Sequence, residues 1–377
     1  MKIIYTINST YNSGGMEKVL CNKVNYFCKE LGFDVIIITT EQKNRENFFS
    51  FDQKIKFIDL AINYDDDLNT NRVIRFFRER KKRKLHKRFL ERIIYQEKPD
   101  ICISMFDRDF NILHKIKDGS KKILEFHFCK KMKVLEQKNP MMKLIQFLRI
   151  KGWENIVSKY DRFVVLTDED KKHWGNIKNI NVIPNSMEIN TSNHSDINKK
   201  NVLSIGRMSY QKGFDMLVQA WQKVIKIHPE WKLTIVGGGE KESIRKKICK
   251  LGLNNNIELK PPTHNIEHEY VNASIYVMSS RYEGLPMVLI EAMSYGLPII
   301  SFSCPCGPKD LIDKEYGILV KPNNIEELAN SIIMLIESKE KRLYLRNQSL
   351  KRAKDFSKDR IMNIWVNLFN DLLSSKI

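Results

Sequence analysis

The chain has 377 residues, enough for two or three domains of ordinary size, and its 42% hydrophobic and 10% aromatic content is typical of a soluble globular protein. It contains no apolar run of the roughly 20 residues that a bilayer-spanning helix needs. Met1 to Tyr5 predicts a strand rather than a signal peptide. The formal net charge of +19 raises the question of an anionic partner.

Seven cysteines are scattered along the chain, and the one close pair, Cys304 and Cys306, has a single residue between its members. This pattern indicates neither a disulfide framework nor a zinc site. We therefore expect reduced thiols, as in cytosolic proteins.

The first part of the chain predicts a βαβ unit. Residues 2–8 form a strand, the loop from Ser9 to Gly15 ends in Ser13-Gly14-Gly15, and apolar residues recur at helical spacing over residues 16–31. A β-branched strand over residues 34–40 follows, which favours a parallel sheet. Later strands are predicted at residues 101–105, 123–128, 163–167 and 181–184. Gly14-Gly15 is either an ordinary tight turn or a loop that lets the backbone approach a phosphate.

The segment Arg72 to Arg92 concentrates positive charge, with 11 basic and 2 acidic residues and an unbroken basic run from Arg80 to Lys84. It is either a solvated helix face or a surface that binds an anionic membrane. A second patch, from Lys130 to Ile150, mixes cations with apolar residues.

Asn185 to Asn198 is polar and lacks apolar periodicity, so it predicts a linker. A second alternation follows, with strands at residues 202–205, 232–236, 257–259, 275–278, 299–302 and 318–320. The intervening helices are predicted near residues 214–227, 240–251, 266–273, 287–295 and 325–337. Such apolar strands with short crossovers are buried on both faces. The sequence therefore predicts an α/β protein of two doubly wound domains.

The stretch from Ser279 to Pro298 is the most informative part of the second half. It places Glu283 in a loop after a strand and Glu291 inside the next helix, with free backbone amides near Leu285, Met287 and Val288. Helix N-terminal amides favour a diphosphate, and a carboxylate can accept bonds from two ribose hydroxyls. The alternative is one solvated Glu and one capping Glu.

A second cluster of motifs lies after two other strands. Arg207 and Lys212, in Gly206 to Gly213, can converge on one anion, although each can also be a solvated loop cation. Gly237 belongs to a Gly-rich strand-to-helix turn, a weak signal alone because glycine turns at such junctions are often only geometric.

Together, Glu283 and Glu291 at E-x7-E spacing and the G-R-x4-K-G pattern at Arg207 and Lys212 resemble the retaining glycosyltransferases of family 4. The resemblance covers nearly the whole chain. It implies the GT-B fold, in which two Rossmann-like domains face each other across a cleft. Residues 1–190 would form the acceptor domain, with a helix over residues 361–377 packing back on it, and residues 191–360 the donor domain.

The resemblance also implies roles for single residues. Gly15 and Gly237 would approach the nucleotide, Glu291 would bind it, and His127 would touch the donor sugar, whereas a lone His is more often structural. Asp107, just beyond a strand, is a candidate for acceptor binding by position. Cys306 to Asp310 departs from the Gly-Gly and Glu found in many members, which leaves the role of Asp310 open.

By this resemblance the enzyme would transfer a hexose or N-acetylhexosamine, UDP-linked, to a glycan or polyprenyl-diphosphate-linked sugar in bacterial surface polysaccharide biosynthesis. We find no Asp-x-Asp loop placed to hold a divalent ion and expect no metal and no cofactor beyond the donor. Arg207 and Lys212 would neutralise the departing diphosphate, and Glu283 would contact the sugar. We expect a cytoplasmic protein, peripheral on the inner face of the membrane.

Two other functions fit part of the sequence. The charge alone permits a nucleic-acid-binding protein, but no recognition helix or stacking ladder accompanies it, so no nucleic-acid partner is expected. A nucleotide-sugar epimerase on the same scaffold is a closer rival, and conversion of UDP-GlcNAc without an acceptor would favour it.

Overall fold

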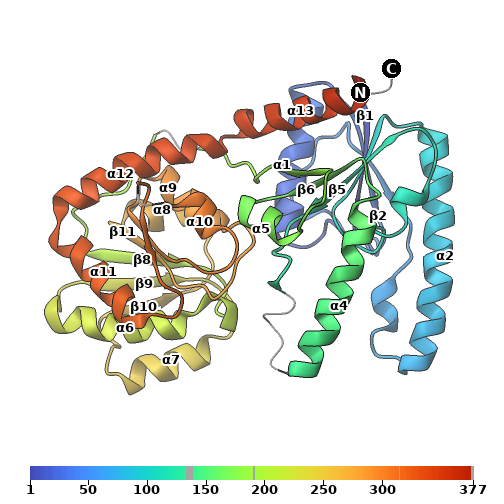
Figure 1. The fold of residues 1–377 in the computed structure, drawn as a ribbon. Coiled ribbons are helices and arrows are strands. Elements are labelled where there is room, and N and C mark those ends of the chain that lie inside the picture. Colours follow the sequence, from blue (N-terminus) through green and yellow to red (C-terminus); the bar gives the residue numbers. More distant parts are fainter. Residues whose placement is uncertain (133–138, 190–191, 314, 375–377) are drawn as a thin grey trace.

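The structure is a computed structural model that describes residues 1–132, 139–189, 192–313 and 315–374 (Figure 1). The strands of the first half are β1 (Lys2–Ile7), β2 (Asp34–Thr39), β3 (Lys56–Asp59), β4 (Ile101–Ser104), β5 (Lys121–Phe126), β6 (Arg162–Val165) and β7 (Ile180–Val182). The helices there are α1 (Gly15–Lys29), α2 (Arg72–Glu97), α4 (Pro140–Val157) and α5 (Asp168–His173), with short 3-10 turns η1 (Tyr64–Asp67) and η2 (Leu113–Lys115).

The second half repeats this alternation. Its strands are β8 (Asn201–Ile205), β9 (Lys232–Val236), β10 (Ile257–Lys260), β11 (Ile275–Met278), β12 (Ile299–Phe302) and β13 (Ile318–Val320). Its helices and turns are η3 (Tyr210–Lys212), α6 (Phe214–Ile227), α7 (Lys241–Lys250), α8 (Ile266–Val271), α9 (Met287–Ser294), α10 (Pro308–Leu311), α11 (Ile325–Glu337), α12 (Lys339–Ala353), η4 (Lys354–Phe356) and α13 (Lys358–Ser374).

The strands form two sheets, ordered β3-β2-β1-β4-β5-β6-β7 and β10-β9-β8-β11-β12-β13. Neighbouring strands run parallel in both sheets. In each sheet the first strand of the domain is central. The next two strands in the chain lie on one side of it, and the remaining strands lie on the other side, which is the doubly wound topology. The predicted fold class of two doubly wound α/β domains is confirmed.

Successive side chains along a strand of the first sheet point to opposite faces, and a hydrophobic core lies on each face. Ile3 and Tyr5 pack on the side of α1, whereas Ile4 packs on the opposite side with Leu90 of α2 and Trp153 of α4. This is the period-two pattern of a strand that is buried on both faces. The second sheet lies within one large core of its own.

The last helix returns from the second sheet to the first, as Figure 1 shows. Ile361, Trp365 and Phe369 of α13 share a hydrophobic cluster with Ile3 and Tyr5. Residues 361–374 therefore belong to the first core, and residues 375–377 of the predicted helix lie outside the described residues.

The predicted linker crosses between the domains beside this returning chain. Met187 forms a parallel bridge with Ser357, and the Met187 amide donates to the Phe356 carbonyl over 2.9 Å. Ser195 is already held to the second domain, because its amide donates to the Tyr295 carbonyl. Residues 190–191 of the linker lie outside the described residues.

Two local features differ from the prediction. Strand β5 spans Lys121–Phe126 rather than residues 123–128, so His127 lies just beyond its end. The edge strand β3 was not predicted, because most of its side chains are exposed and show no apolar pattern. Among the described residues, every helix is too short or too polar to span a bilayer.

Candidate functional site

Strands β8 and β11 are neighbours from which the second sheet extends in opposite directions. The loops that follow such a pair diverge and leave a crevice at the carboxyl ends of the strands, where ligands bind in open α/β sheets. Here these loops are residues 206–213 and 279–286, so the topology brings the two predicted motifs together.

An ion pair connects the two loops. The Lys212 ammonium lies 2.7 Å from Glu283 Oε1, and the two side chains are 18% and 7% exposed. Gln211 Nε2 also contacts the loop that carries Glu283, because it donates to the Tyr282 carbonyl over 3.1 Å. Two predicted catalytic residues, 71 positions apart, thus lie in direct contact.

Hydrogen bonds and close packing also hold the two loops together. Ser279 Oγ donates to the Lys212 carbonyl over 3.0 Å. Gly213 has φ +63°, and a Cβ there would lie 2.1 Å from the Ser279 carbonyl oxygen, so only glycine fits. Arg281 forms a two-bond pair with Asp215 at 2.9 and 2.7 Å and lies over the Tyr210 ring. The contribution of Arg281 was not predicted, because its contacts form only when the two loops face each other.

Glu291 lies in α9 and accepts a hydrogen bond from the Tyr270 hydroxyl over 2.7 Å. Burial raises the pKa of Glu291, and the Tyr270 bond and the Lys18 ammonium oppose that shift. Lys18 belongs to α1 of the first domain, so a charge of the other domain acts on this carboxyl group. Tyr270 stacks on Tyr295 at 4.9 Å between ring centroids, which holds the hydroxyl in place.

Arg207 and Gly237 lie at the ends of the adjacent strands β8 and β9. Arg207 is exposed, and its stem passes close to Gly239. A Cβ at Gly237 would lie 1.9 Å from the Gly206 carbonyl oxygen, so the two strand ends approach closely. Arg207 thus lies in the same loop as Lys212 and is exposed.

A cavity of ≈ 370 Å³ separates the start of α1 from the start of α9. It brings together four predicted residues, Gly15, His127, Leu285 and Met287. Val288, also predicted, packs against the second core instead. The domains touch beside this cavity, since a Cβ at Gly284 would lie 3.0 Å from the His127 carbonyl oxygen.

His127 is bound into a buried charge network. Its Nε2 lies 3.1 Å from Glu125 Oε2, which also accepts from the Lys23 ammonium over 2.6 Å. The carboxylate and the ammonium belong to β5 and α1 respectively. His127 Nδ1 is buried and has no partner among the described residues. A buried polar atom of this kind beside a cavity is suited to a polar ligand.

Asp107 and Asp109 follow strand β4. In the first sheet β4 lies next to β1, just as β11 lies next to β8 in the second sheet. Asp109 accepts from Thr6 Oγ1 at 2.6 Å and Ser104 Oγ at 3.0 Å. Asp107 instead lines a cavity of ≈ 250 Å³. Burial, followed by the Asp109 carboxylate, raises the pKa of Asp107 to about 7.

This cavity in the first domain combines cations with aromatic rings. Its lining includes Arg83 of α2, Arg108, Arg149 of α4, and the aromatic side chains Tyr64, Phe106, Phe110, Phe126, Phe128 and Trp153. The arginines can bind an anion and the rings can pack on a sugar.

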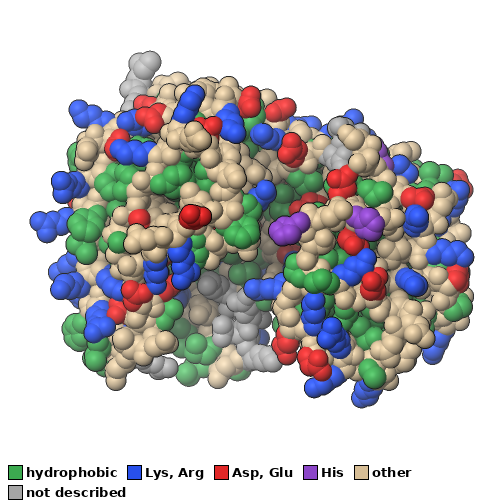
Figure 2. Space-filling view, turned by 180° about the vertical axis from the view of Figure 1, so that it is seen from behind, with side chains coloured by type: hydrophobic (Ala, Val, Ile, Leu, Met, Phe, Trp, Pro, Cys, Tyr) green, Lys and Arg blue, Asp and Glu red, His purple; other side chains and the backbone are tan. Residues whose placement is uncertain are grey.

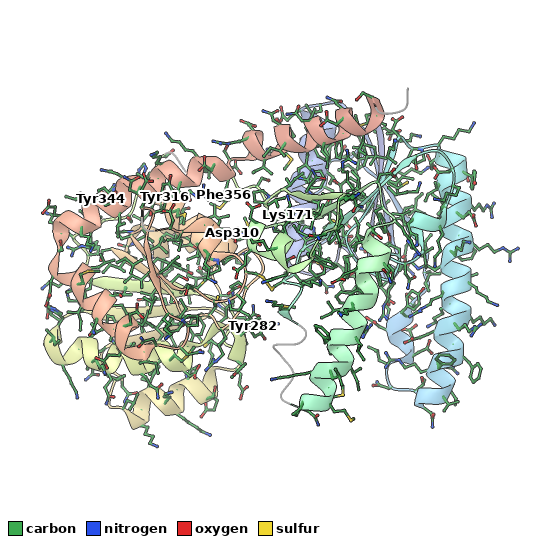
Figure 3. All side chains as sticks on the ribbon, in the orientation of Figure 1. Lys171, Tyr282, Asp310, Tyr316, Tyr344 and Phe356 are labelled. Atoms are coloured by element: carbon green, nitrogen blue, oxygen red, sulfur yellow. A yellow bond between two sulfur atoms is a disulfide. The ribbon has the colours of Figure 1, made fainter. Side chains whose placement is uncertain are left out.

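Asp310, whose role the sequence left open, contacts the other domain. Its Oδ1 accepts from the Asp168 and Glu169 amides at 2.9 and 3.2 Å, at the first turn of α5. Figure 3 shows Asp310 at the junction of the domains, near Lys171 of α5. Asp310 therefore caps a helix across the interface and fixes the angle between the domains.

The expectation that all cysteines are separate thiols is corrected. Cys129 and Cys306, 177 positions apart, form a disulfide between the domains. Their sequence separation hid the pair, because the two cysteines meet only where the two domains pack together. Cys304 lies nearby as a free, buried thiol.

Comparison with known families and proteins agrees with this arrangement. The family described as glycosyl transferases group 1 matches residues 186–352, which contain the whole second sheet. An uncharacterized glycosyltransferase of Methanocaldococcus jannaschii is 30% identical over 332 residues, covering 73% of this chain and 80% of that protein. One from Haemophilus influenzae is 35% identical over 227 residues, covering 58% and 64%. This last match spans less than two thirds of the relative.

A third relative matches from end to end. It is the GalNAc-alpha-(1->4)-GalNAc-alpha-(1->3)-diNAcBac-PP-undecaprenol alpha-1,4-N-acetyl-D-galactosaminyltransferase of Campylobacter jejuni, 28% identical over 381 residues and covering 99% of each chain.

Solved structures share the whole fold. A mutant of TarM from S. aureus, in complex with Fondaparinux, alpha-GlcNAc-glycerol and UDP, has a TM-score of 0.78 at 17% identity, covering 98% of this chain and 99% of that chain. The lipopolysaccharide outer core galactosyltransferase WaaB has a TM-score of 0.73 at 21% identity, covering 100% of both. At these identities the likeness shows the fold, which is GT-B.

Proposed function

Because the chain belongs to the group 1 glycosyltransferases, we propose that it is a retaining, family 4 enzyme of bacterial surface polysaccharide biosynthesis. Its donor is a nucleotide sugar, UDP-linked, that carries a hexose or N-acetylhexosamine. Its acceptor is a glycan or a polyprenyl-diphosphate-linked sugar. The observation that supports this most is the Lys212–Glu283 contact at the carboxyl ends of β8 and β11, with Glu291 in the following helix.

In this proposal the second domain binds the donor. The Glu291 carboxylate accepts from two ribose hydroxyls, and the amides at the start of α9 face the diphosphate. Arg207 and Lys212 neutralise the charge that develops on the leaving diphosphate. Arg207 has the freedom to close on the ligand, because its side chain is exposed.

Transfer with retention follows from the same groups. Glu283 contacts the sugar once Lys212 moves toward the diphosphate, and the leaving phosphate helps to receive the acceptor's proton. The acceptor oxygen then bonds to the anomeric carbon on the face that the phosphate leaves. His127 contacts the donor sugar from the first domain, at the cavity that it lines. Domain closure completes the site and excludes water.

The acceptor is proposed to enter through the first domain. The cavity at Asp107 offers Arg83, Arg108 and Arg149 to a diphosphate and aromatic rings to a sugar. The Campylobacter jejuni relative is named for an undecaprenol-PP-linked acceptor, and this chain matches it throughout.

A membrane-facing surface is proposed beside that cavity. Helix α2 exposes Val73, Phe76 and Phe77 next to its basic run, and α4 exposes large apolar side chains. Those of α4 are Met141, Met142, Leu144, Ile145, Phe147 and Leu148. Figure 2 shows Lys and Arg interspersed with hydrophobic side chains along the edge of the first domain. Such a mixture suits the interface of an anionic leaflet. Residues 133–138 of the second predicted patch lie outside the described residues.

The test is transfer from UDP-sugars to a polyprenyl-diphosphate-linked sugar, with no divalent ion added and with NMR of the product. We expect a product that keeps the anomeric configuration of the donor. Lys212→Ala and Glu291→Ala should abolish transfer while the protein stays folded, whereas Lys246→Ala on the exposed face of α7 should retain full activity. An inverted product, or full activity in either site variant, would contradict the proposal.

A further inference from the structure

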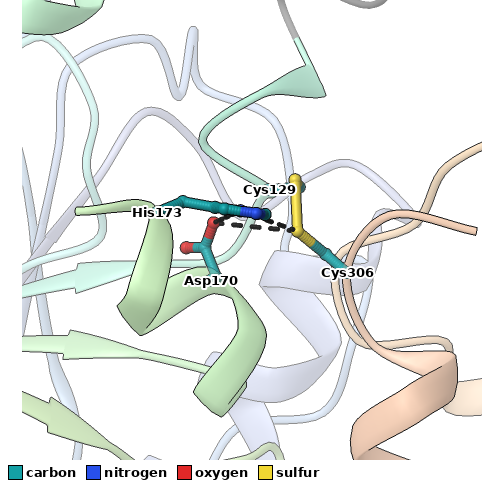
Figure 4. Close-up of side chains that lie close together, drawn as sticks. All are labelled: Cys129, Asp170, His173 and Cys306. Atoms are coloured by element: carbon teal, nitrogen blue, oxygen red, sulfur yellow. Dashed lines mark hydrogen bonds and ion pairs between the residues drawn. A yellow bond between two sulfur atoms is a disulfide. The ribbon is translucent and has the colours of Figure 1, made fainter. Parts of the chain in front are cut away.

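Four side chains that can each supply one metal ligand meet where the two domains touch (Figure 4). The Cys306 sulfur lies 3.8 Å from Asp170 Oδ1 and 3.7 Å from His173 Nδ1. His173 Nδ1 lies 3.8 Å from Asp170 Oδ1. With the Cys129 sulfur included, all four ligand atoms lie within 4.8 Å of one another.

The structure joins Cys129 and Cys306 in a disulfide. Reduction of that bond yields two thiols, which ionise to thiolates when they bind a metal. Two thiolates, the Asp170 carboxylate and the His173 imidazole then share a small, largely buried space. A cation supplies the attraction that such a group of atoms lacks.

We propose that Cys129, Asp170, His173 and Cys306 form a structural Zn²⁺ site that joins the two domains in the reduced protein. Two thiolates, one imidazole nitrogen and one carboxylate oxygen are the ligand types of tetrahedral zinc. Zinc–ligand bonds of about 2.0–2.3 Å place tetrahedral ligand atoms roughly 3.3–3.8 Å apart. The distances from Cys306 to Asp170 and His173 fall in that range.

The groups around the cluster hold its ligands in position. Asp170 Oδ1 accepts from the Lys130 amide over 2.8 Å, and its Oδ2 accepts from Trp174 Nε1 over 3.1 Å. Such bonds orient carboxylate ligands in metal sites. Cys306 has a positive φ of 61°, which is uncommon for a residue with a side chain and typical of functional positions. This conformation turns the Cys306 sulfur toward the other domain.

The site connects the domain contact to the catalytic loop. Three ligands belong to the first domain and Cys306 to the second. The Glu283 amide donates to the Pro305 carbonyl over 3.1 Å, so the loop that carries Cys306 also supports Glu283. If the proposed function holds, the ion keeps the closed arrangement that the transfer needs, and its binding requires the thiol form of Cys129 and Cys306.

The test is the metal content of the full-length protein, purified from a reducing cytosol without chelators. We expect about one zinc ion per chain by mass spectrometry. Cys306→Ser and His173→Ala should lower zinc affinity by at least about tenfold, whereas Cys304→Ser, a buried thiol two residues away, should bind zinc like the wild type. Cobalt reconstitution should give thiolate-to-metal and tetrahedral absorption bands that Cys306→Ser weakens.

Two results would overturn the inference. One is reduced protein that binds neither Zn²⁺ nor Co²⁺ when titrated, and the other is zinc binding whose affinity is unchanged in both Cys306→Ser and His173→Ala. Circular dichroism of each variant separates ligand loss from unfolding. Because metal content needs no sugar donor, a zinc protein without transferase activity would refute the proposed function and leave the zinc site standing.

Discussion

The Lys212–Glu283 pair has two separable effects, one on stability and one on transfer. Lys212→Ala leaves a buried carboxylate without its cation, which should lower the free energy of unfolding by about 1–3 kcal/mol. Adding Glu283→Gln removes the stranded charge and should recover most of that stability, as measured by denaturant unfolding. Transfer should stay absent in the double variant. A double variant that regains activity would show that the pair is only structural.

Asp107 should make stability depend on pH. Its folded-state pKa of about 7 lies above the value in an unfolded chain, so between roughly pH 4 and 7 the folded state holds a proton that the unfolded chain has lost. Stability contributed by this group is therefore lost as pH rises through that range. Asp107→Asn should raise the melting temperature at pH 8 by about 2 °C or more and change it less at pH 5. Equal effects at both pH values would contradict this assignment.

The candidate site shows which residues a sequence can identify. Lys212, Glu283 and Glu291 were predicted because each stands in a motif with fixed spacing next to a strand end. The residues that support them were not predicted. Tyr270, which donates to Glu291, and Arg281, which pairs with Asp215 between the two loops, have no local signal and reach the site only through tertiary packing. Cys129 and Cys306 were missed for the same reason, being far apart in the sequence.

At the scale of elements, the last helix is the strongest link between the end of the chain and the first core. Trp365 of α13 is 2% exposed, and the Lys23 ammonium lies 4.0 Å from its ring centroid. Trp365→Ala should destabilise the protein by about 3–5 kcal/mol, because it leaves a cavity against β1. Ile364→Ala, one residue away but 38% exposed, should change stability by less than about 0.5 kcal/mol. Denaturant unfolding of the two variants makes this comparison.

Helix α2 should bind anionic membranes through its basic face. Lys81 and Lys84 are exposed, and each cation near an anionic leaflet contributes about 1 kcal/mol. Lys81→Glu with Lys84→Glu should weaken sedimentation with phosphatidylglycerol vesicles by at least about tenfold. Lys246→Glu, which makes a charge reversal on the exposed face of α7, should leave vesicle binding close to that of the wild type. Equal losses from both surfaces would mean that net charge, rather than α2, controls association.

Elements whose apolar residues follow a clear period were predictable, and those without such a pattern were not. The strands of both sheets are nearly continuous apolar runs, so their positions were correct within about two residues. Strand β3 lies at a sheet edge with exposed side chains, and α12 has few buried residues, so neither gave a usable signal. The two-residue shift of β5 changed the place of His127 from the strand to the loop after it.

For the whole molecule, the arrangement of the domains determines which residues can act together. Gly15 and His127 come from the first domain, Leu285 and Met287 from the second, and they line one cavity only because Asp310, α5 and the Cys306 loop hold the domains in contact.

Asp310→Ala removes the cap from the first turn of α5 and should raise the KM for the acceptor more than it changes donor affinity. A matched substitution on the same helix, Lys309→Ala, should change this KM less. Glu169, the partner of Lys309, would still accept the hydrogen bond from the Cys306 amide.

The central claim is that the crevice between β8 and β11 binds the nucleotide of a sugar donor. Thermal shift of the full chain against a panel of UDP- and GDP-sugars tests it most directly, because a ligand that binds only the folded state stabilises it by mass action. We predict a selective rise in melting temperature with one nucleotide class, lost in Glu291→Ala and in Lys212→Ala and kept in Lys246→Ala. No stabilisation by any nucleotide sugar, or the same stabilisation in all four proteins, would contradict the account.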